Sequence, residues 1–173
     1  MSLLRRLGSV LARALRPSGR APVSGSARVT AVDSPGRSGA TATRAVSPPS
    51  ARGLTIAYAP MRDGDADAGE IVWTWVPYEE NDGRGKDRPV VIMAALGSGS
   101  VLAVQLTSKD HTGDPDHVPL GVTEGDRDRR ASWAAVDRLF RVHPDGVRRE
   151  GAWVDAARYR LIERALRARY GWR

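Results

Sequence analysis

Residues 70–106 contain three β-rich runs whose spacing constrains the fold more than any other feature of the chain. Residues 89–96 (PVVIMAAL) and 101–106 (VLAVQL) are apolar runs of strand length, separated by Gly-Ser-Gly-Ser. A short Gly-rich connection between two such runs is typical of a β-hairpin. Residues 70–76 alternate two sets of side chains with the period of a strand. This part of the chain therefore predicts an antiparallel sheet built around one hairpin.

The residues after the hairpin predict further strands and one closing helix. Residues 108–117 predict a loop, 118–121 a short strand, 132–143 another strand, and 143–146 (HPDG) a turn. A helix is expected over 153–169, where one apolar stripe follows the helical period: Val154, Ala157, Leu161, Ile162, Ala165 and Leu166. Several strands followed by a terminal helix predict a mainly β fold, a small barrel with helical cover.

The N-terminal part of the chain differs from the rest in composition and charge. Residues 1–52 hold nine Arg and one Asp, a formal charge of +8, whereas the remainder holds 18 basic and 19 acidic residues, a charge of −1. Residues 17–52 hold almost none of the large apolar side chains that offset the entropy of ordering a chain. We therefore expect residues 1–60 to be a basic, mostly disordered extension, 61–68 an acidic linker, and 69–173 the folded domain.

Within this extension, residues 2–16 combine a helical apolar period with arginines and no acidic group. Such a segment is typical of a transit peptide or a membrane-surface anchor; the alternatives are a disordered or transiently helical tail and an over-extended gene start. Residues 54–60 predict a short extended or helical lead-in. No apolar run approaches the roughly 20 residues that span a bilayer, so we expect a cytoplasmic protein without a membrane partner.

The side-chain inventory excludes several classes of active site. The chain has no Cys, which excludes disulfides, zinc–thiolate sites and cysteine nucleophiles. Its three histidines, His111, His117 and His143, do not match the HxxxH or HExxH spacing of common zinc sites. The alternating aspartates of residues 63–67 lack the Gly and Glu that complete a calcium loop. We therefore expect no metal site and no cofactor.

Arg88 and Thr107 lie at the open end of the predicted hairpin. If residues 98–99 form a two-residue turn, Arg88 faces Lys109, and Thr107 is its diagonal neighbour on the same face, about 7–8 Å away at the backbone. A cation and a hydroxyl at this separation can bind one small anionic group. Three further basic side chains converge at the same end: Arg84, Lys86 and Lys109. The alternative is structural: Arg88 pairs with Asp87 or Glu79, and Thr107 is an ordinary strand residue.

Three motifs follow one another in a characteristic order between residues 69 and 108, at the start of a resemblance that extends to residue 172 through the 132–142 strand and the closing helix. They are an opening Gly-Glu-Ile, an Arg-Pro-Val-Val-Ile strand that begins at Arg88, and a Leu-Thr-Ser that ends the next long strand. This pattern resembles the PemK/MazF family of toxin–antitoxin endoribonucleases, whereas residues 1–60 find no counterpart there. The resemblance implies an SH3-like barrel that forms a homodimer and is held inactive by a cognate antitoxin protein.

The resemblance also implies an activity and a site. In that family the Arg of the Arg-Pro pair and the Thr that ends the next long strand are catalytic, which here are Arg88 and Thr107. The implied reaction is metal-independent cleavage of single-stranded RNA, in which the 2′-OH attacks the adjacent phosphorus and leaves a cyclic phosphate and a 5′-OH. Nearby polar residues are then candidates for RNA binding: Arg84, Lys86, Ser108 and Lys109.

This reaction needs a group that accepts the 2′-OH proton. Arginine is a poor general base because its pKa lies above 12. His111, on the loop after Thr107, has a suitable unperturbed pKa and is our own candidate for this role. The alternative is that His111 is an exposed loop histidine.

Two sequence features depart from the family pattern. The loop between Pro77 and Arg88 is acidic, which disfavours the binding of RNA phosphates, and Phe140 stands where family members often have an arginine.

Four of the tryptophans are expected to have structural roles. We expect Trp73 and Trp75 to pack in the core or in a dimer interface. Trp153 and Trp172 are expected to hold the terminal helix, which leaves Trp133 as a candidate RNA-groove residue.

Two other functions fit the same pattern. One is a catalytically silent barrel that inhibits a protein target, as CcdB-like toxins do, and whose toxicity would survive Arg88→Ala. The other is a simple SH3-like interaction module without toxicity, which predicts normal growth on overexpression.

Overall fold

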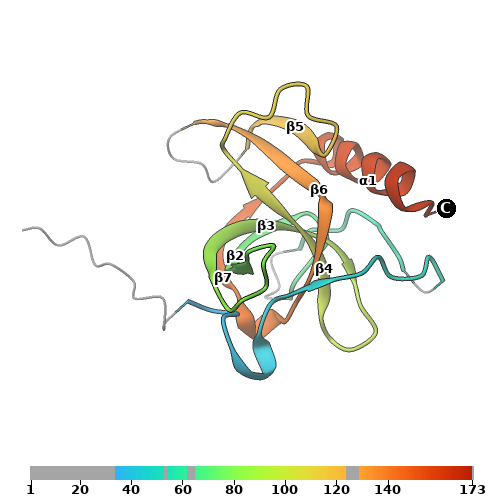
Figure 1. Ribbon diagram of the computed structural model, residues 1–173. Helices are drawn as coiled ribbons and strands as arrows, with labels where there is room; N and C mark the ends of the chain where they lie inside the picture. Colours follow the sequence, from blue (N-terminus) through green and yellow to red (C-terminus); the bar gives the residue numbers. More distant parts are fainter. Residues whose placement is uncertain (1–33, 53, 62–64, 124–128, 173) are drawn as a thin grey trace, which may run out of the picture.

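The computed structural model describes residues 34–52, 54–61, 65–123 and 129–172. Seven antiparallel strands form one sheet in the order β1-β6-β4-β3-β2-β7, with β5 also paired to β6. The strands are β1 (Arg44–Val46), β2 (Glu70–Pro77), β3 (Gly85–Ala95), β4 (Val101–Thr107), β5 (His117–Val122), β6 (Ala131–Val142) and β7 (Arg148–Trp153). The sheet curls on itself, and the one α-helix of the described residues, α1 (Ala156–Tyr170), lies beside β5 and β6 (Figure 1). The predicted mainly β fold with a C-terminal helix is confirmed.

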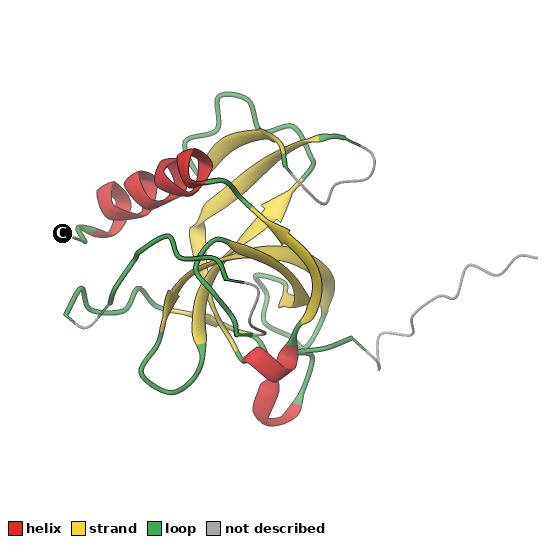
Figure 2. Ribbon diagram, turned by 180° about the vertical axis from the view of Figure 1, so that it is seen from behind, coloured by secondary structure: helices red, strands yellow, loops and turns green. Residues whose placement is uncertain are grey.

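Two short 3₁₀ helices, η1 (Gly39–Thr41) and η2 (Pro144–Gly146), lie side by side at the end of the barrel away from α1 (Figure 2). The second forms at the predicted 143–146 turn. There His143 Nδ1 accepts a hydrogen bond from the Asp145 backbone N–H, which caps the turn.

The predicted pairing register of the hairpin is wrong. Val90 pairs with Gln105 and not with Thr107. Two features cause the difference. Residues 96–100 form a longer connection, closed by a 2.7 Å hydrogen bond from Leu96 N to Ser100 O, and β3 contains an irregularity between Ile92 and Ala94 that shifts the register again. The predicted polar loop is also shorter than expected, because β3 begins at Gly85.

The expectation of disorder is wrong for residues 34–52; residues 1–33 lie outside the described residues. Strand β1 pairs with the edge of β6, so that Ala45 faces Phe140. The segment before it is held by main-chain and hydroxyl bonds, among them Trp75 N to Pro35 O at 2.9 Å and Thr43 Oγ1 to Thr74 Oγ1 at 2.6 Å. The amino-acid composition did not predict that residues 34–52 are ordered, because hydrogen bonds to an existing sheet edge do not require large apolar side chains.

The lead-in and the linker also belong to the folded unit. Residues 54–60 contain no helix or strand, yet Ile56 is buried in the main core, and Tyr58 donates a hydrogen bond to Val154 O at 3.0 Å. Asp67 accepts a 2.9 Å hydrogen bond from Met61 N, so the described part of the acidic segment turns back on itself. The domain therefore starts well before residue 69.

The buried residues form two clusters. The larger one contains the buried side of α1, namely Tyr159, Ile162 and Leu166, and the Tyr159 hydroxyl donates to Met93 O at 2.6 Å. The smaller one, called the inner cluster below, comprises Val72, Val76, Val90, Ile92, Val101, Ala103, Phe140 and Val142.

Helix α1 starts and ends slightly later than predicted. Asp155 is its N-cap and accepts a 2.8 Å hydrogen bond from Arg158 N, while Gly171 ends it in the left-handed conformation with φ 67°. The expected apolar stripe is only partly correct, since Leu161 is 37% exposed and Tyr159 is fully buried. Trp172 is buried beside the helix, as expected, and its Nε1 donates to Pro49 O.

Strand β2 alternates as predicted, but the expectation of core packing for Trp73 and Trp75 is wrong. Val72, Thr74 and Val76 are the buried set, whereas both tryptophans are only partly buried. Each indole ring lies under an arginine on the outer face of the sheet: Arg148 is 5.3 Å from the Trp73 ring and Arg37 is 4.8 Å from the Trp75 ring.

Candidate functional site

Arg88, Thr107 and Trp133 form a row across β3, β4 and β6. Arg88 precedes Val90 by two residues, so both side chains are on the inner-cluster face of β3. Thr107 pairs directly with Trp133 on β6. Continuing the Val90–Gln105 register by two residues on each strand places Thr107 opposite Arg88. The observed register thus brings the two candidate residues together as direct neighbours rather than diagonal ones.

The guanidinium of Arg88 has no partner among the described residues. Its side chain is partly buried, and within the described ranges no hydrogen bond or ion pair reaches it. The alternative that Arg88 pairs with Asp87 is wrong, because this carboxylate pairs with Arg148 at 2.9 Å on the opposite face of β3. Glu79 is exposed in the loop before β3 and does not form the other expected pair. A partly desolvated guanidinium without a counter-ion is suited to bind an anion.

The Thr107 hydroxyl is oriented by the chain that follows it. Its Oγ1 accepts a 3.1 Å hydrogen bond from the backbone N–H of Lys109. A hydroxyl that accepts one bond keeps its own O–H to donate. Ser108 and Lys109 are exposed immediately beyond it.

The other predicted basic residues divide into two groups. Lys86 is exposed on β3 and alternation places it on the same face as Arg88. Arg84 lies outside this arrangement: its Nε pairs with Asp82 Oδ2 at 2.6 Å within the loop, and this bond raises the pKa of Arg84 further above its ordinary value. Asp82 and Asp87 are therefore both neutralised by arginines, which reduces the repulsion expected from the acidic loop.

Phe140 cannot contact a ligand because it is 1% exposed in the inner cluster. The arginine beside it is Arg138, whose guanidinium lies 5.0 Å from the Phe140 ring and donates to Pro77 O at 3.1 Å. Arg138 therefore anchors the loop after β2.

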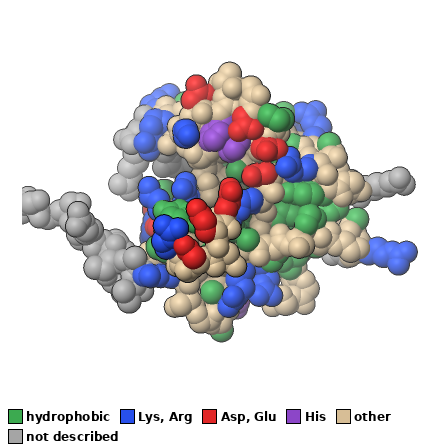
Figure 3. Space-filling view, in the orientation of Figure 1, with side chains coloured by type: hydrophobic (Ala, Val, Ile, Leu, Met, Phe, Trp, Pro, Cys, Tyr) green, Lys and Arg blue, Asp and Glu red, His purple; other side chains and the backbone are tan. Residues whose placement is uncertain are grey.

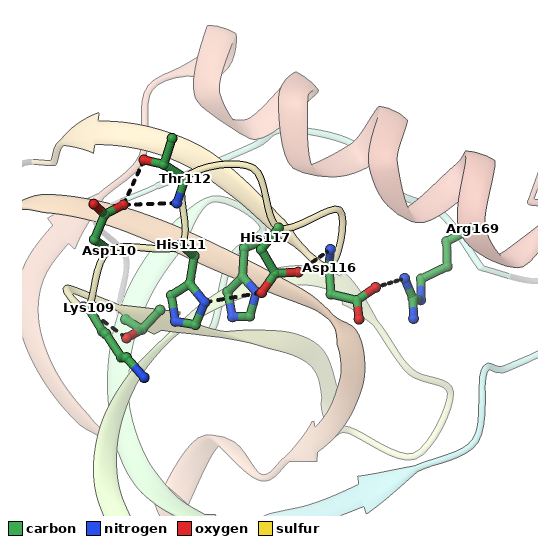
Figure 4. A network of polar contacts seen from close by, with 9 residues as sticks. Lys109, Asp110, His111, Thr112, Asp116, His117 and Arg169 are labelled. Carbon is green, nitrogen blue, oxygen red and sulfur yellow. Dashed lines mark hydrogen bonds and ion pairs between the residues drawn. The ribbon is translucent and has the colours of Figure 1, made fainter.

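His111 is part of a cluster that the sequence reasoning missed (Figure 4). Asp114 Oδ2 lies 3.2 Å from His111 Nδ1 and 2.8 Å from His117 Nδ1. The two imidazole rings are stacked, with centroids 3.5 Å apart and planes 11° from parallel. The side chains are only 20% and 14% exposed, so the expectation of an exposed loop histidine is wrong. The available signal was the spacing of the three residues, each three positions from the next.

The loop between β4 and β5 that carries these residues is held by its own polar contacts. Asp110 accepts hydrogen bonds from the backbone N–H and the hydroxyl of Thr112, at 2.8 and 2.7 Å. Asp116 pairs with Arg169 of α1, as Figure 4 shows. A hydrogen bond from the Asp116 N–H and then contacts from His111 hold the pKa of the Asp114 carboxyl below its ordinary value. Histidine reaches the surface in the upper half of Figure 3, next to acidic side chains.

A family model matches residues 67–169, more than half of the chain, and is described as the PemK-like, MazF-like toxin of type II toxin–antitoxin systems. The chain belongs to this toxin family. No curated protein sequence matches it significantly.

Solved structures with a similar arrangement include two MazF toxins. One is MazF from Deinococcus radiodurans, with 19% identity and a TM-score of 0.47, over 61% of this chain and 96% of that one. Another is the Mycobacterium tuberculosis toxin MazF-mt6, with 16% identity and a TM-score of 0.45, over 60% of this chain and 98% of that one. None of the helices in the described part of the chain has both the length and the apolar character required to cross a membrane.

Proposed function

We propose that this toxin is a metal-independent, sequence-selective endoribonuclease that cleaves single-stranded RNA, with Arg88 and Thr107 as its catalytic residues. The observation that carries the proposal is the unpartnered guanidinium of Arg88 on the same face of the sheet as the Thr107 hydroxyl. Family membership supports the reaction class.

The reaction follows from the charges of these two groups. The ribose O2′ attacks the adjacent phosphorus, the bond from phosphorus to O5′ breaks, and the products are a 2′,3′-cyclic phosphate and a 5′-hydroxyl. Negative charge grows on the non-bridging oxygens in the pentavalent transition state. The planar fork of Arg88 matches two of these oxygens, and the free O–H of Thr107 can donate to one of them.

The proton of the 2′-OH must move to a base, and O5′ must gain a proton as it leaves. We propose His111 as the base. With its Nδ1 beside Asp114, the tautomer that donates from Nδ1 leaves the Nε2 lone pair free to accept. If His111→Ala cleaves RNA at the wild-type rate, this assignment is wrong while the roles of Arg88 and Thr107 stand.

RNA binding is proposed for the polar side chains around this pair. Trp133, opposite Thr107, offers an aromatic face on which a base can stack. Lys86, Ser108 and Lys109 are exposed and can contact the backbone phosphates. Arg84 is a weaker candidate because Asp82 already binds its guanidinium.

Family membership also leads to proposals about assembly. We propose a cognate antitoxin as the protein partner, a homodimer as the assembled form, and the cytoplasm as the location. Light scattering after gel filtration of the purified chain tests the homodimer, and copurification with the product of the adjacent gene tests the antitoxin.

The decisive experiment incubates the full purified chain with a long single-stranded RNA in EDTA. Discrete cuts are expected, each leaving a cyclic phosphate and a 5′-hydroxyl, with strong loss in Arg88→Ala and Thr107→Ala. Arg160→Ala is the matched control, because Arg160 is exposed on α1. A folded wild-type protein that makes no cuts would contradict the proposal and favour inhibition of a protein target. The full chain is required, since a truncation at residue 53 would remove β1.

A further inference from the structure

We propose that His111, Asp114 and His117 form a binding site for a divalent transition-metal ion of the zinc class. The proposed RNA cleavage needs no metal, but it shares His111 with this site: an ion on Nδ1 would replace the proton that Nδ1 donates to Asp114 when His111 acts as the base. The proposed metal site rests on three donor side chains that the β4–β5 loop brings together, within 4.8 Å of one another.

The donor set fits zinc and its neighbours in the first transition row. Two imidazole nitrogens and one carboxylate oxygen are preferred ligands of Zn²⁺, Co²⁺ and Ni²⁺, whereas Mg²⁺ and Ca²⁺ prefer oxygen alone. Three protein ligands leave a fourth tetrahedral position for water. The part of the cluster that remains exposed, including 37% of the Asp114 side chain, gives solvent access to that position.

Small movements would bring the donor atoms to the separations of a bound site. Tetrahedral ligands held about 2.0–2.1 Å from zinc lie about 3.4 Å from one another. The nitrogen-to-oxygen contact of His111, 3.2 Å, is close to this value, whereas that of His117, 2.8 Å, is about 0.6 Å shorter and must lengthen when an ion binds. Because the rings are nearly parallel, they must tilt toward each other to direct both nitrogens at one ion.

The contacts of His117 supply a further argument. Its Nδ1 is buried and, among the described residues, makes no hydrogen bond of good geometry, although Asp114 Oδ2 is 2.8 Å away. A buried polar atom without an aligned partner is costly and calls for an explanation. An ion bound between this nitrogen and the carboxylate would satisfy both.

Neighbouring groups already orient the carboxylate ligand. The backbone N–H of Asp116 donates to Asp114 Oδ1 at 2.9 Å, which leaves Oδ2 directed at the two rings. The backbone also links the three residues, with Asp114 N bonded to His111 O and His117 N bonded to Asp114 O. Hydrogen bonds of this kind to a ligand strengthen metal binding.

A bound ion would join the loop after Thr107 to the first residue of β5. His111 lies on the loop, and His117 pairs with Ala135 of β6 at the start of β5. The ion would therefore reduce the motion of the segment that supports the Thr107 hydroxyl through Lys109 N.

The test is direct titration of the full chain, stripped of metal with EDTA, dialysed and freed of any polyhistidine tag. Zn²⁺ binding is measured by calorimetry, and Co²⁺ binding by the visible absorption bands of a tetrahedral site. One ion per chain is expected for the wild type. Loss of a supporting group commonly weakens metal binding about 10- to 100-fold, so His111→Ala, His117→Ala and Asp114→Asn should each weaken it at least about tenfold.

His143→Ala is the matched control, because His143 also lies near an aspartate, at 3.7 Å from Asp145, but outside the cluster. Its affinity should equal that of the wild type. Circular dichroism shows whether each variant folds. Absence of Zn²⁺ and Co²⁺ binding by the folded wild type would overturn the proposal. Equal binding by the wild type and a folded His111→Ala/His117→Ala double variant would overturn it as well.

Discussion

The two faces of the sheet at β2 and β3 use their arginines in different ways. On the outer face, Arg148 pairs with Asp87 at 2.9 Å and with Glu150 at 3.4 Å, and it lies over the Trp73 ring. On the inner-cluster face, the Arg88 side chain has no hydrogen bond or ion pair within the described parts of the chain.

This difference separates a guanidinium whose donors are occupied by carboxylates from one that can still bind a ligand. A guanidinium whose donors are occupied by carboxylates contributes to stability and has little capacity left for a ligand. A partly buried guanidinium without such partners is desolvated at a cost that only an anion can offset. In a chain with 25 arginines, the surroundings of the guanidinium therefore select a candidate ligand-binding residue better than residue type does.

The largest expected effect compares Arg88→Ala with Arg148→Ala in RNA cleavage. Removing a cation that stabilises a phosphoryl transition state costs about 10³-fold or more in rate, so Arg88→Ala should be nearly inactive. Arg148→Ala should cleave within about twofold of the wild type, since its charge is already paired on the other face. Single-turnover cleavage rates in EDTA measure both. Equal losses of cleavage rate in the two variants would show that the arginines on the two faces of the sheet do not differ in function.

The next effect concerns the hydroxyl beside Arg88. Thr107→Val keeps the shape of the side chain but removes the donor, and loss of one such donor costs about 10²–10³-fold in rate. Thr107→Ser keeps the hydroxyl and should retain most of the activity. If the serine variant is as slow as the valine variant, Thr107 acts through packing rather than through its O–H.

The third prediction concerns the buried hydroxyl of Thr74, which links β2 to η2 and to the segment before β1. The Thr74 hydroxyl donates to Gly146 O at 2.8 Å and contacts Thr43 Oγ1 at 2.6 Å, all in the interior. Thr74→Val leaves these groups unsatisfied and should lower the free energy of unfolding by about 1–3 kcal/mol. Chemical denaturation measures the loss. Thr55→Val, at an exposed position, is the control and should change stability by less than about 0.5 kcal/mol.

The smallest effect is on the outer face. Arg148→Ala removes two ion pairs whose partners are partly exposed, so the free energy of unfolding should fall by at most about 1 kcal/mol. The loss should shrink in high salt, because salt screens exposed charges. Denaturation at low and high ionic strength measures it. A large, salt-independent loss would show that packing on Trp73, rather than charge, dominates the outer face.

The strands were predictable where side-chain periodicity is strong. The alternation in β2 and the apolar run of β4 gave the positions of these strands nearly to the residue, and the run of β3 gave its end but not its start, which is four residues earlier, at Gly85. Strands β1 and β7 were missed, because both are short edge strands with few apolar side chains, stabilised by pairing with β6 and β2. The register of the hairpin also escaped prediction, since it depends on a strand irregularity that the sequence does not mark.

The sequence predicted which residues belong to the candidate site but not all of the contacts around them. Alternation along two strands places Arg88 and Thr107 on one face only if the turn length keeps the parity of the register. The ion pair between Asp87 and Arg148, which takes this carboxylate away from Arg88, joins residues 61 positions apart. The spacing of His111, Asp114 and His117 was a signal, but whether the two rings stack depends on the path of a loop.

The sequence by itself therefore determined the fold class, the family and the two strands that carry Arg88 and Thr107, because periodicity and motif order are local properties. Only the tertiary structure decided that the Arg88 side chain has no hydrogen bond or ion pair to the described residues, which face of β2 is buried, and that His111, Asp114 and His117 lie together. These features depend on contacts between segments distant in sequence or on the path of a loop. The free energies that select such contacts arise only when the chain is packed.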